Sequence, residues 1–165
     1  MSSPALLAAQ GTFSLSEQEF LETVFEGDVP QPQRLWVKGA LREELTQILG
    51  HKPGFLRAPF WRKDNTTVWV LNEIGKTKPI TTGVVVKRAA DGADRIASVK
   101  VLAFRESRGW EVKYSFFTDQ FKQLQRKAEG GLSSRIDGIS GATLSVKALK
   151  KQAEAALLLN AAADT

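Results

Sequence analysis

Residues 137–145 have the sequence DGISGATLS, in which a loop of small residues leads into the last helix that the pattern predicts. Ser140 and Thr143 place two hydroxyls near the start of that helix, beside residues with almost no side chain. Free backbone N–H groups and the helix dipole favour a negative group such as phosphate at this point. A threonine hydroxyl here could bind phosphate or be esterified to it. The alternative is an ordinary helix cap followed by a glycine turn.

The last predicted helix is amphipathic and runs from about residue 143 to residue 159. One face is apolar and the opposite face is charged, as expected for a helix packed on a core. The lysines of the charged face are typical of solvated positions, and they could also attract an acidic partner. The apolar face consists of Val146, Leu149, Ala153, Ala156 and Leu157, and the charged face of Lys147, Lys150, Lys151 and Glu154.

Upstream, alternating β-branched residues predict an antiparallel sheet. Residues 67–71 and 80–87 have the composition of strands, and residues 90–93 predict a hairpin turn into a strand at 95–104. The period of two predicts that Val99 and Val101 are buried and that Lys100 is exposed. The same alternation places Ala97 and Ala103 on the face of Val99 and Val101, and it predicts a further strand at Trp110, Val112, Tyr114 and Phe116.

The first third of the sequence predicts helices. Ser16 and Glu19 form a capping box before an apolar run that includes Phe20 and Leu21. A second helix is predicted at 34–49, with Gly50 as its C-terminal stop. Together the elements predict a single α+β domain, with a mostly antiparallel sheet packed by helices and a C-terminal helix that opens at the Ser-Gly-Ala-Thr motif.

Composition narrows the possible chemistry. The chain has 165 residues, which suits one domain, and its 42% of hydrophobic residues is typical of a globular protein. Cysteine is absent and His51 is the one histidine, so thiol chemistry is excluded and we predict neither a metal site nor a catalytic triad. We predict no catalytic residues, because the chain offers no general acid–base array.

Charge and hydropathy limit the partners. The net charge of +5 favours an anionic partner, but the basic residues are dispersed, so we expect no nucleic acid. No run approaches the roughly 20 apolar residues of a membrane span. The first residues, MSSPALLAAQG, have a short apolar stretch and no basic n-region, so they do not form an intact signal peptide.

Residues 137–143, DGISGAT, resemble the flavinylation motif of the FMN-binding domain family, an acidic residue followed by Ser/Thr-Gly-Ala-Thr. The family includes flavin-carrying subunits of the sodium-pumping NADH:quinone oxidoreductase and of Rnf-type complexes. In these proteins a magnesium-dependent flavin transferase uses FAD to attach FMN through a phosphoester to the last threonine of the motif. The resemblance implies that Thr143 is the acceptor, surrounded by the cofactor-binding residues Asp137, Ser140, Gly141, Ala142, Leu144 and Ser145.

Residues 104–112, FRESRGWEV, resemble the family segment, often Glu-Thr-Pro-Gly, that lies against the flavin ring. Glu106 and Gly109 match this pattern, Ser107 replaces threonine and Arg108 replaces proline. The resemblance therefore implies Glu106, Ser107, Gly109 and Trp110 as further cofactor-binding residues. It covers roughly residues 67–159.

The resemblance implies a small FMN-carrying electron-transfer flavoprotein rather than an independent enzyme. Its FMN would be covalent, and protein made without the transferase would be an apo form. Expected partners are the flavin transferase with FAD and magnesium, and a redox partner protein, which can be membrane-bound. The expected location is periplasmic or otherwise extracytoplasmic, with the signal peptide absent from this chain.

Residues 55–165 would form the FMN-binding domain, and residues 1–54 an N-terminal helical segment packed on it. Two alternatives remain: a non-catalytic anion- or phosphate-binding module, and an interaction domain without covalent flavin.

Overall fold

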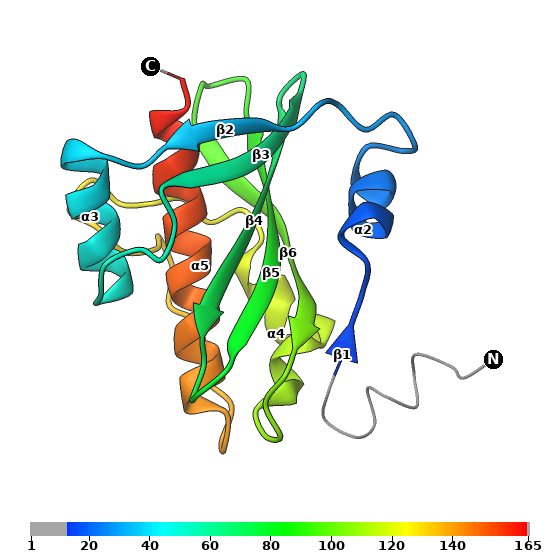
Figure 1. The fold of residues 1–165 in the computed structure, drawn as a ribbon, viewed down its shortest axis with the longest axis vertical. Coiled ribbons are helices and arrows are strands. Elements are labelled where there is room, and N and C mark those ends of the chain that lie inside the picture. Colours follow the sequence, from blue (N-terminus) through cyan, green and yellow to red (C-terminus); the bar gives the residue numbers. More distant parts are fainter. Residues whose placement is uncertain (1–12, 165) are drawn as a thin grey trace.

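An antiparallel sheet forms the centre of the computed structural model, which describes residues 13–164 (Figure 1). Six strands of this part of the chain lie in the order β1-β6-β5-β4-β3-β2. The strands are β1 Phe13–Ser14, β2 Gln33–Trp36, β3 Arg57–Lys63, β4 Thr66–Ile74, β5 Pro79–Arg88 and β6 Asp94–Phe104. The α-helices are α2 Glu17–Val24, α3 Gly39–Leu49, α4 Ser115–Thr118 and α5 Thr143–Ala162, and the 3-10 helices are η1 Trp110–Lys113 and η2 Asp119–Phe121. The stretch MSSPALLAAQG lies outside the described residues.

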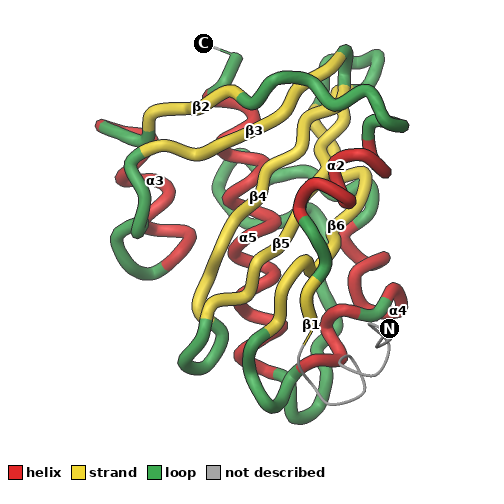
Figure 2. The backbone as a smooth tube through the Cα atoms, turned by 45° about the vertical axis from the view of Figure 1, so that its right-hand side comes forward, coloured by secondary structure: helices red, strands yellow, loops and turns green. Residues whose placement is uncertain are grey.

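Helices cover both faces of the sheet, so the fold is the predicted single α+β domain. The long helix α5 and its neighbour α3 pack on one face, and α2 packs on the other (Figures 1 and 2). The alternation of β5 shows the two cores, because Val84 and Val86 face α5 while Val85 faces α2. No helix of the described part is both long and apolar enough to cross a membrane.

Strand β6 confirms part of the predicted alternation and corrects the rest. Val99 and Val101 are buried and Lys100 is exposed, as predicted. Ala97 and Ala103, however, do not share the face of Val99 and Val101, because the pairing with β5 skips Ala97 and Leu102. Each such bulge adds one residue to the strand, and the extra residue shifts the following side chains to the opposite face.

Local capping signals in the N-terminal third are confirmed. Ser16 is the N-cap of α2, and its hydroxyl accepts a hydrogen bond from the Glu19 N–H at 3.4 Å. Gly50 ends α3 in the left-handed region, with φ 80°. Residues before 55 also add β2 to the sheet, where it pairs with β3. The division of the chain between residues 54 and 55 stays a prediction.

The predicted helix at 34–49 begins too early. Residues 33–36 instead form β2, which pairs antiparallel with β3 from Gln33 opposite Phe60 to Trp36 opposite Arg57. The helix itself starts at Gly39. The partner strand lies more than twenty residues further along the chain, so a local pattern could not reveal the pairing.

The predicted strand at 110–116 is also wrong. This segment forms η1 and the start of α4, and both pack on the α5 side of the sheet through Val112 and Phe117. The end of β6 at which a hairpin with this segment would start is paired with β1, which lies opposite Ala103 and Phe104. Gly109, with φ 86°, turns the chain away from β6 just before η1.

Buried polar side chains fix α5 on the sheet. The Gln152 amide donates hydrogen bonds to the carbonyls of Leu71 at 3.0 Å and Ile80 at 2.8 Å, and its oxygen accepts one from the Thr82 hydroxyl at 2.9 Å. Near the other end of α5, the Asn160 amide oxygen accepts a hydrogen bond from the Trp69 indole at 2.9 Å. These bonds set the rotation of α5 about its axis, and therefore the direction in which its N-terminus presents Thr143.

Candidate functional site

A cavity of about 670 Å³ lies at the N-terminus of α5. Three parts of the chain meet there: the start of α5, the loop after β6 and the turn between β4 and β5. Its volume lies within the usual range of small-molecule sites, roughly 300–1,000 Å³. The residues that line it are Lys76, Glu106, Ser107, Arg108, Gly109, Gly141, Ala142, Thr143, Leu144 and Ser145.

The start of α5 has no side-chain cap. Ala142 occupies the N-cap position, and no side chain of residues 13–164 forms a capping hydrogen bond there. The simple capping role considered for Ser140 and Thr143 is therefore wrong. Gly141, with φ 82°, adopts a backbone conformation that other residues rarely take, and it is exposed. The N–H groups of the first turn thus remain for an anionic ligand, which the dipole of this 20-residue helix also favours.

The two hydroxyls of the first helical turn differ in access. Thr143 is exposed and lines the cavity, whereas Ser145 is only 5% exposed. The Ser145 side chain packs against Gly109. A Cβ atom on residue 109 would lie only 2.2 Å from the Ser145 hydroxyl oxygen. The contact joins the loop after β6 to α5. It also makes Thr143 the accessible hydroxyl of the pair.

Glu106 holds the turn that forms another wall of the cavity. Its carboxylate is buried and accepts hydrogen bonds from the backbone N–H groups of Thr77 at 2.6 Å and Lys78 at 2.5 Å. The Thr77 N–H bond, aided by that from Lys78, lowers the pKa of Glu106 below its ordinary value. Glu106 is thus an ionised side chain that fixes the turn between β4 and β5.

Two cations at the cavity give it a positive character. Lys76 comes from the turn that Glu106 fixes, and Arg108 from the loop after β6. Both are exposed, and neither forms an ion pair within residues 13–164. Sequence reasoning missed Lys76 because the site forms only when the turn folds toward α5. Arg108 stands where the family often has proline, so the resemblance does not indicate a role for its charge.

Three residues implied by the resemblance lie apart from the lining of this cavity. The Asp137 backbone N–H donates to the Gln120 side chain at 2.7 Å, and its carboxylate side chain is exposed. Ser140 is exposed just before Gly141. The ring of Trp110 packs edge-on against Tyr114, with centroids 5.6 Å apart. The structure therefore brings together the helix start, Glu106, Ser107 and Gly109, but not these three side chains.

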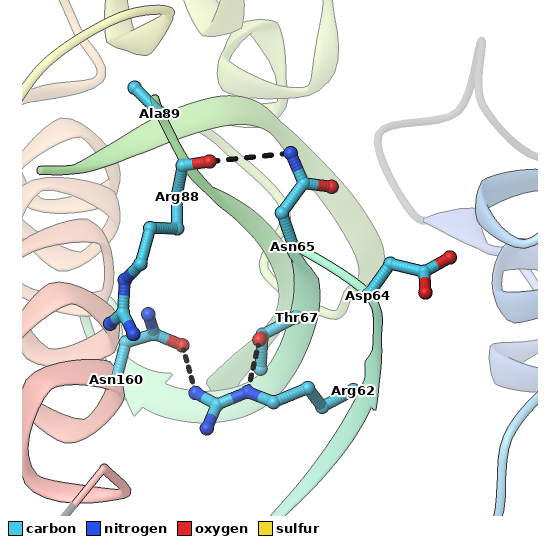
Figure 3. Close-up of a pocket in the computed structure, with 7 residues that line it drawn as sticks. All are labelled: Arg62, Asp64, Asn65, Thr67, Arg88, Ala89 and Asn160. Carbon is cyan, nitrogen blue, oxygen red and sulfur yellow. Dashed lines mark hydrogen bonds between the residues drawn. The ribbon is translucent and has the colours of Figure 1, made fainter. Parts of the chain in front are cut away.

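A second cavity, of about 320 Å³, contains two arginines at the far end of α5 (Figure 3). Arg62 donates to Asn160 at 3.1 Å and pairs with Asp164 at 3.0 Å. Arg88 pairs with Asp94 at 2.8 Å and also with Asp164. Because carboxylates of the same chain neutralise both arginines, this cluster joins α5 to the sheet and leaves neither arginine free for an anionic ligand.

The cavity at the start of α5 fits a phosphorylated ligand. It combines an exposed hydroxyl, an uncapped helix start and two unpaired cations. Within residues 13–164, no group of three or more acidic or histidine side chains could hold a metal ion.

One family model covers the candidate site. The FMN-binding domain family matches residues 75–158, which are about half of the 165 residues and contain every residue that lines the cavity. No curated protein and no solved structure shows significant similarity to the chain.

Proposed function

Because this chain belongs to the FMN-binding domain family, with FMN as its cofactor, we propose that it is a small electron-transfer flavoprotein whose FMN is attached through a phosphoester to Thr143. The observation that carries this proposal is the exposed Thr143 at the uncapped start of α5, inside a cavity with two unpaired cations. Bound FMN supplies one- and two-electron chemistry.

The residues of the cavity suit the phosphate end of FMN. The N–H groups of the first turn of α5 would donate to the phosphate oxygens, and Gly141 allows a close approach to the backbone. Lys76 and Arg108 would balance the negative charge. Glu106 would act indirectly, by holding the turn that carries Lys76.

The electron-transfer role draws support from the state of Glu106. A general base works best with a pKa near the operating pH. Hydrogen bonds from two backbone N–H groups lower the pKa of Glu106 instead, and they occupy one of its oxygens. The carboxylate of this cavity therefore suits a fixed structural charge better than proton transfer.

Maturation would require a flavin transferase with FAD and magnesium. The Thr143 hydroxyl oxygen would form the new bond to phosphorus and lose its proton, while the pyrophosphate bond of FAD breaks and AMP leaves. We also propose that the mature protein exchanges electrons with a redox partner on the extracytoplasmic side. The motif at residues 137–143 supports these proposals by its likeness to flavinylated domains.

The acceptor hydroxyl can be tested by intact-mass measurement after production with a flavin transferase and FAD. We expect FMN on the wild type and on Ser145→Ala, and none on Thr143→Val. Valine keeps the branched shape of threonine, and Thr143 is exposed, so this variant should fold normally. FMN on Thr143→Val but not on Ser145→Ala would move the attachment to Ser145.

Non-covalent binding of FMN is the second candidate function. The uncapped helix start and its cations could hold a phosphate without an ester bond. The two cases differ on denaturation: a covalent flavin stays with the polypeptide, whereas a non-covalent one is released. A wild type that stays colourless in the presence of transferase and FAD would contradict both.

A further inference from the structure

A groove beside α5 carries basic side chains that have no partner among residues 13–164. It has a volume of about 550 Å³ and lies between α3, the segment 127–136 and α5. Four of its cations form no ion pair or side-chain hydrogen bond within the described chain. These four residues, here called the basic groove, are Lys127, Arg135, Lys147 and Lys150.

No carboxylate of residues 13–164 pairs with the four cations of the basic groove. Glu154 also lines the cavity, but Arg126 binds it at 3.0 Å. Lys151 lines it too and is paired with the buried Glu73 at 3.6 Å. The arginine cavity of Figure 3 differs in this respect, since Asp94 and Asp164 neutralise its cations. Four uncompensated cations in one concavity attract a polyanion.

The shape and floor of the groove favour a protein as the occupant. Ile48, Leu132 and Ile136 contribute apolar surface among the cations. A flat membrane surface could not reach the floor of a concave groove. An acidic protein segment could place carboxylates on the cations and an apolar side chain on the floor, as in the polar rim and apolar centre of protein interfaces.

The basic groove adjoins the proposed attachment residue. Lys147 follows Thr143 by four residues in α5, so the two side chains lie on one helix face, with Cβ atoms roughly 5–6 Å apart. On the other side, segment 127–136 ends where the motif at 137–143 begins. We propose that the basic groove is the docking surface for an acidic redox partner protein. The inference rests on the proposed electron-transfer function.

The docking surface can be tested without flavin. The probe is fluorescein-labelled poly-L-glutamate, with binding followed by anisotropy at low ionic strength. We expect Lys147→Glu/Lys150→Glu to weaken binding on the order of tenfold. The matched control is Lys87→Glu/Lys100→Glu, which makes the same change in net charge at exposed lysines of β5 and β6. The control should lose far less affinity, and equal losses would overturn the proposal.

A second probe distinguishes a protein from a lipid partner. Vesicles containing phosphatidylglycerol offer the same negative charge on a flat surface. Binding to vesicles that exceeds binding to poly-L-glutamate, and that disappears in Lys147→Glu/Lys150→Glu, would overturn the choice of an acidic protein.

The redox role is tested with the flavinylated protein and two small oxidants of opposite charge. Reduced flavin passes one electron to each of two ferricyanide ions, giving ferrocyanide, and its protons go to solvent. We expect Lys147→Glu/Lys150→Glu to slow this reaction several-fold at low salt, because ferricyanide is an anion. The same variant should speed the reaction with hexaammineruthenium, which is a cation. At high salt both rates should approach those of the wild type, because salt screens the charges. Equal rates in Lys147→Glu/Lys150→Glu and in the control variant would overturn the role of the basic groove in electron transfer, while the proposed function of the protein would stand.

Failure of the wild type to accept FMN would overturn both the proposed function and the role of the groove in electron transfer. The poly-L-glutamate comparison would still decide whether the groove binds acidic chains.

Discussion

Lys76 and Lys78 lie in the same turn between β4 and β5, and both are exposed, but the cavity at the start of α5 is lined by Lys76 and not by Lys78. The Glu106 carboxylate fixes this turn through the N–H groups of Thr77 and Lys78. Two chemically identical side chains thus have different positions relative to the proposed flavin. They form a matched pair with which the electrostatics of the site can be measured.

We expect Lys76→Gln to lower the midpoint potential of the flavinylated protein on the order of 30 mV, because a nearby cation stabilises the extra negative charge of a reduced flavin. Lys78→Gln should leave the potential nearly unchanged. Spectroelectrochemical titration of both variants measures the difference. Equal shifts would show that Lys76 has no special position relative to the flavin.

At the scale of the element, α5 depends on one buried amide for its orientation. Gln152 satisfies the Thr82 hydroxyl and the carbonyls of Leu71 and Ile80, and both Gln152 and Thr82 are buried. A buried polar group that loses its partner costs about 1–3 kcal/mol. The amide therefore ties the rotation of the helix to the stability of the fold.

We expect Gln152→Leu to lower the free energy of unfolding by about 2–4 kcal/mol, since it leaves several buried groups unpaired. In the double variant Thr82→Val/Gln152→Leu the unpaired hydroxyl is also removed, so the loss should be smaller than the sum of the two single losses. Urea unfolding of the four proteins gives this coupling. Purely additive losses would mean that the hydrogen bond between Thr82 and Gln152 contributes nothing to stability.

At the scale of the whole molecule, His51 and Glu73 connect the loop after α3 to β4. The His51 ring lies 2.8 Å from the Glu73 carboxylate, which is 5% exposed and also pairs with Lys151 of α5. The pKa of His51 is raised from 6.5, first by its hydrogen bond to the Lys52 carbonyl and then by that to Glu73. The folded protein therefore binds the His51 proton more tightly than the unfolded chain does.

Because the pKa of His51 is higher in the folded state, the charge of His51 stabilises the fold. This stabilisation is fully present below pH 6.5, the pKa in the unfolded chain, and it is lost as the pH rises through the pKa in the folded state. We therefore expect the wild type to be more stable relative to His51→Gln at about pH 5.5 than at about pH 8.5. Urea unfolding of both proteins across this range measures the difference, in which titrations common to both cancel. Parallel pH profiles would contradict a role for the His51 charge.

Short-range signals in the sequence determined three helix ends and the motif. Ser16 caps its helix, Gly50 ends another in the left-handed region, and the last helix begins at Thr143 as predicted. Each of these features depends on hydrogen bonds or backbone preferences within a few residues, so the local sequence contains the necessary information. The family assignment followed from the motif in the same way.

Only the tertiary structure decided which distant segments meet. Strand β2 pairs with β3, and β1 takes the end of β6 at which a hairpin with residues 110–116 would start. Lys76 joins the site because Glu106, 30 residues further on, holds its turn. The free energy of these contacts comes from partners far apart in the chain, whereas periodicity and propensity describe only neighbouring residues.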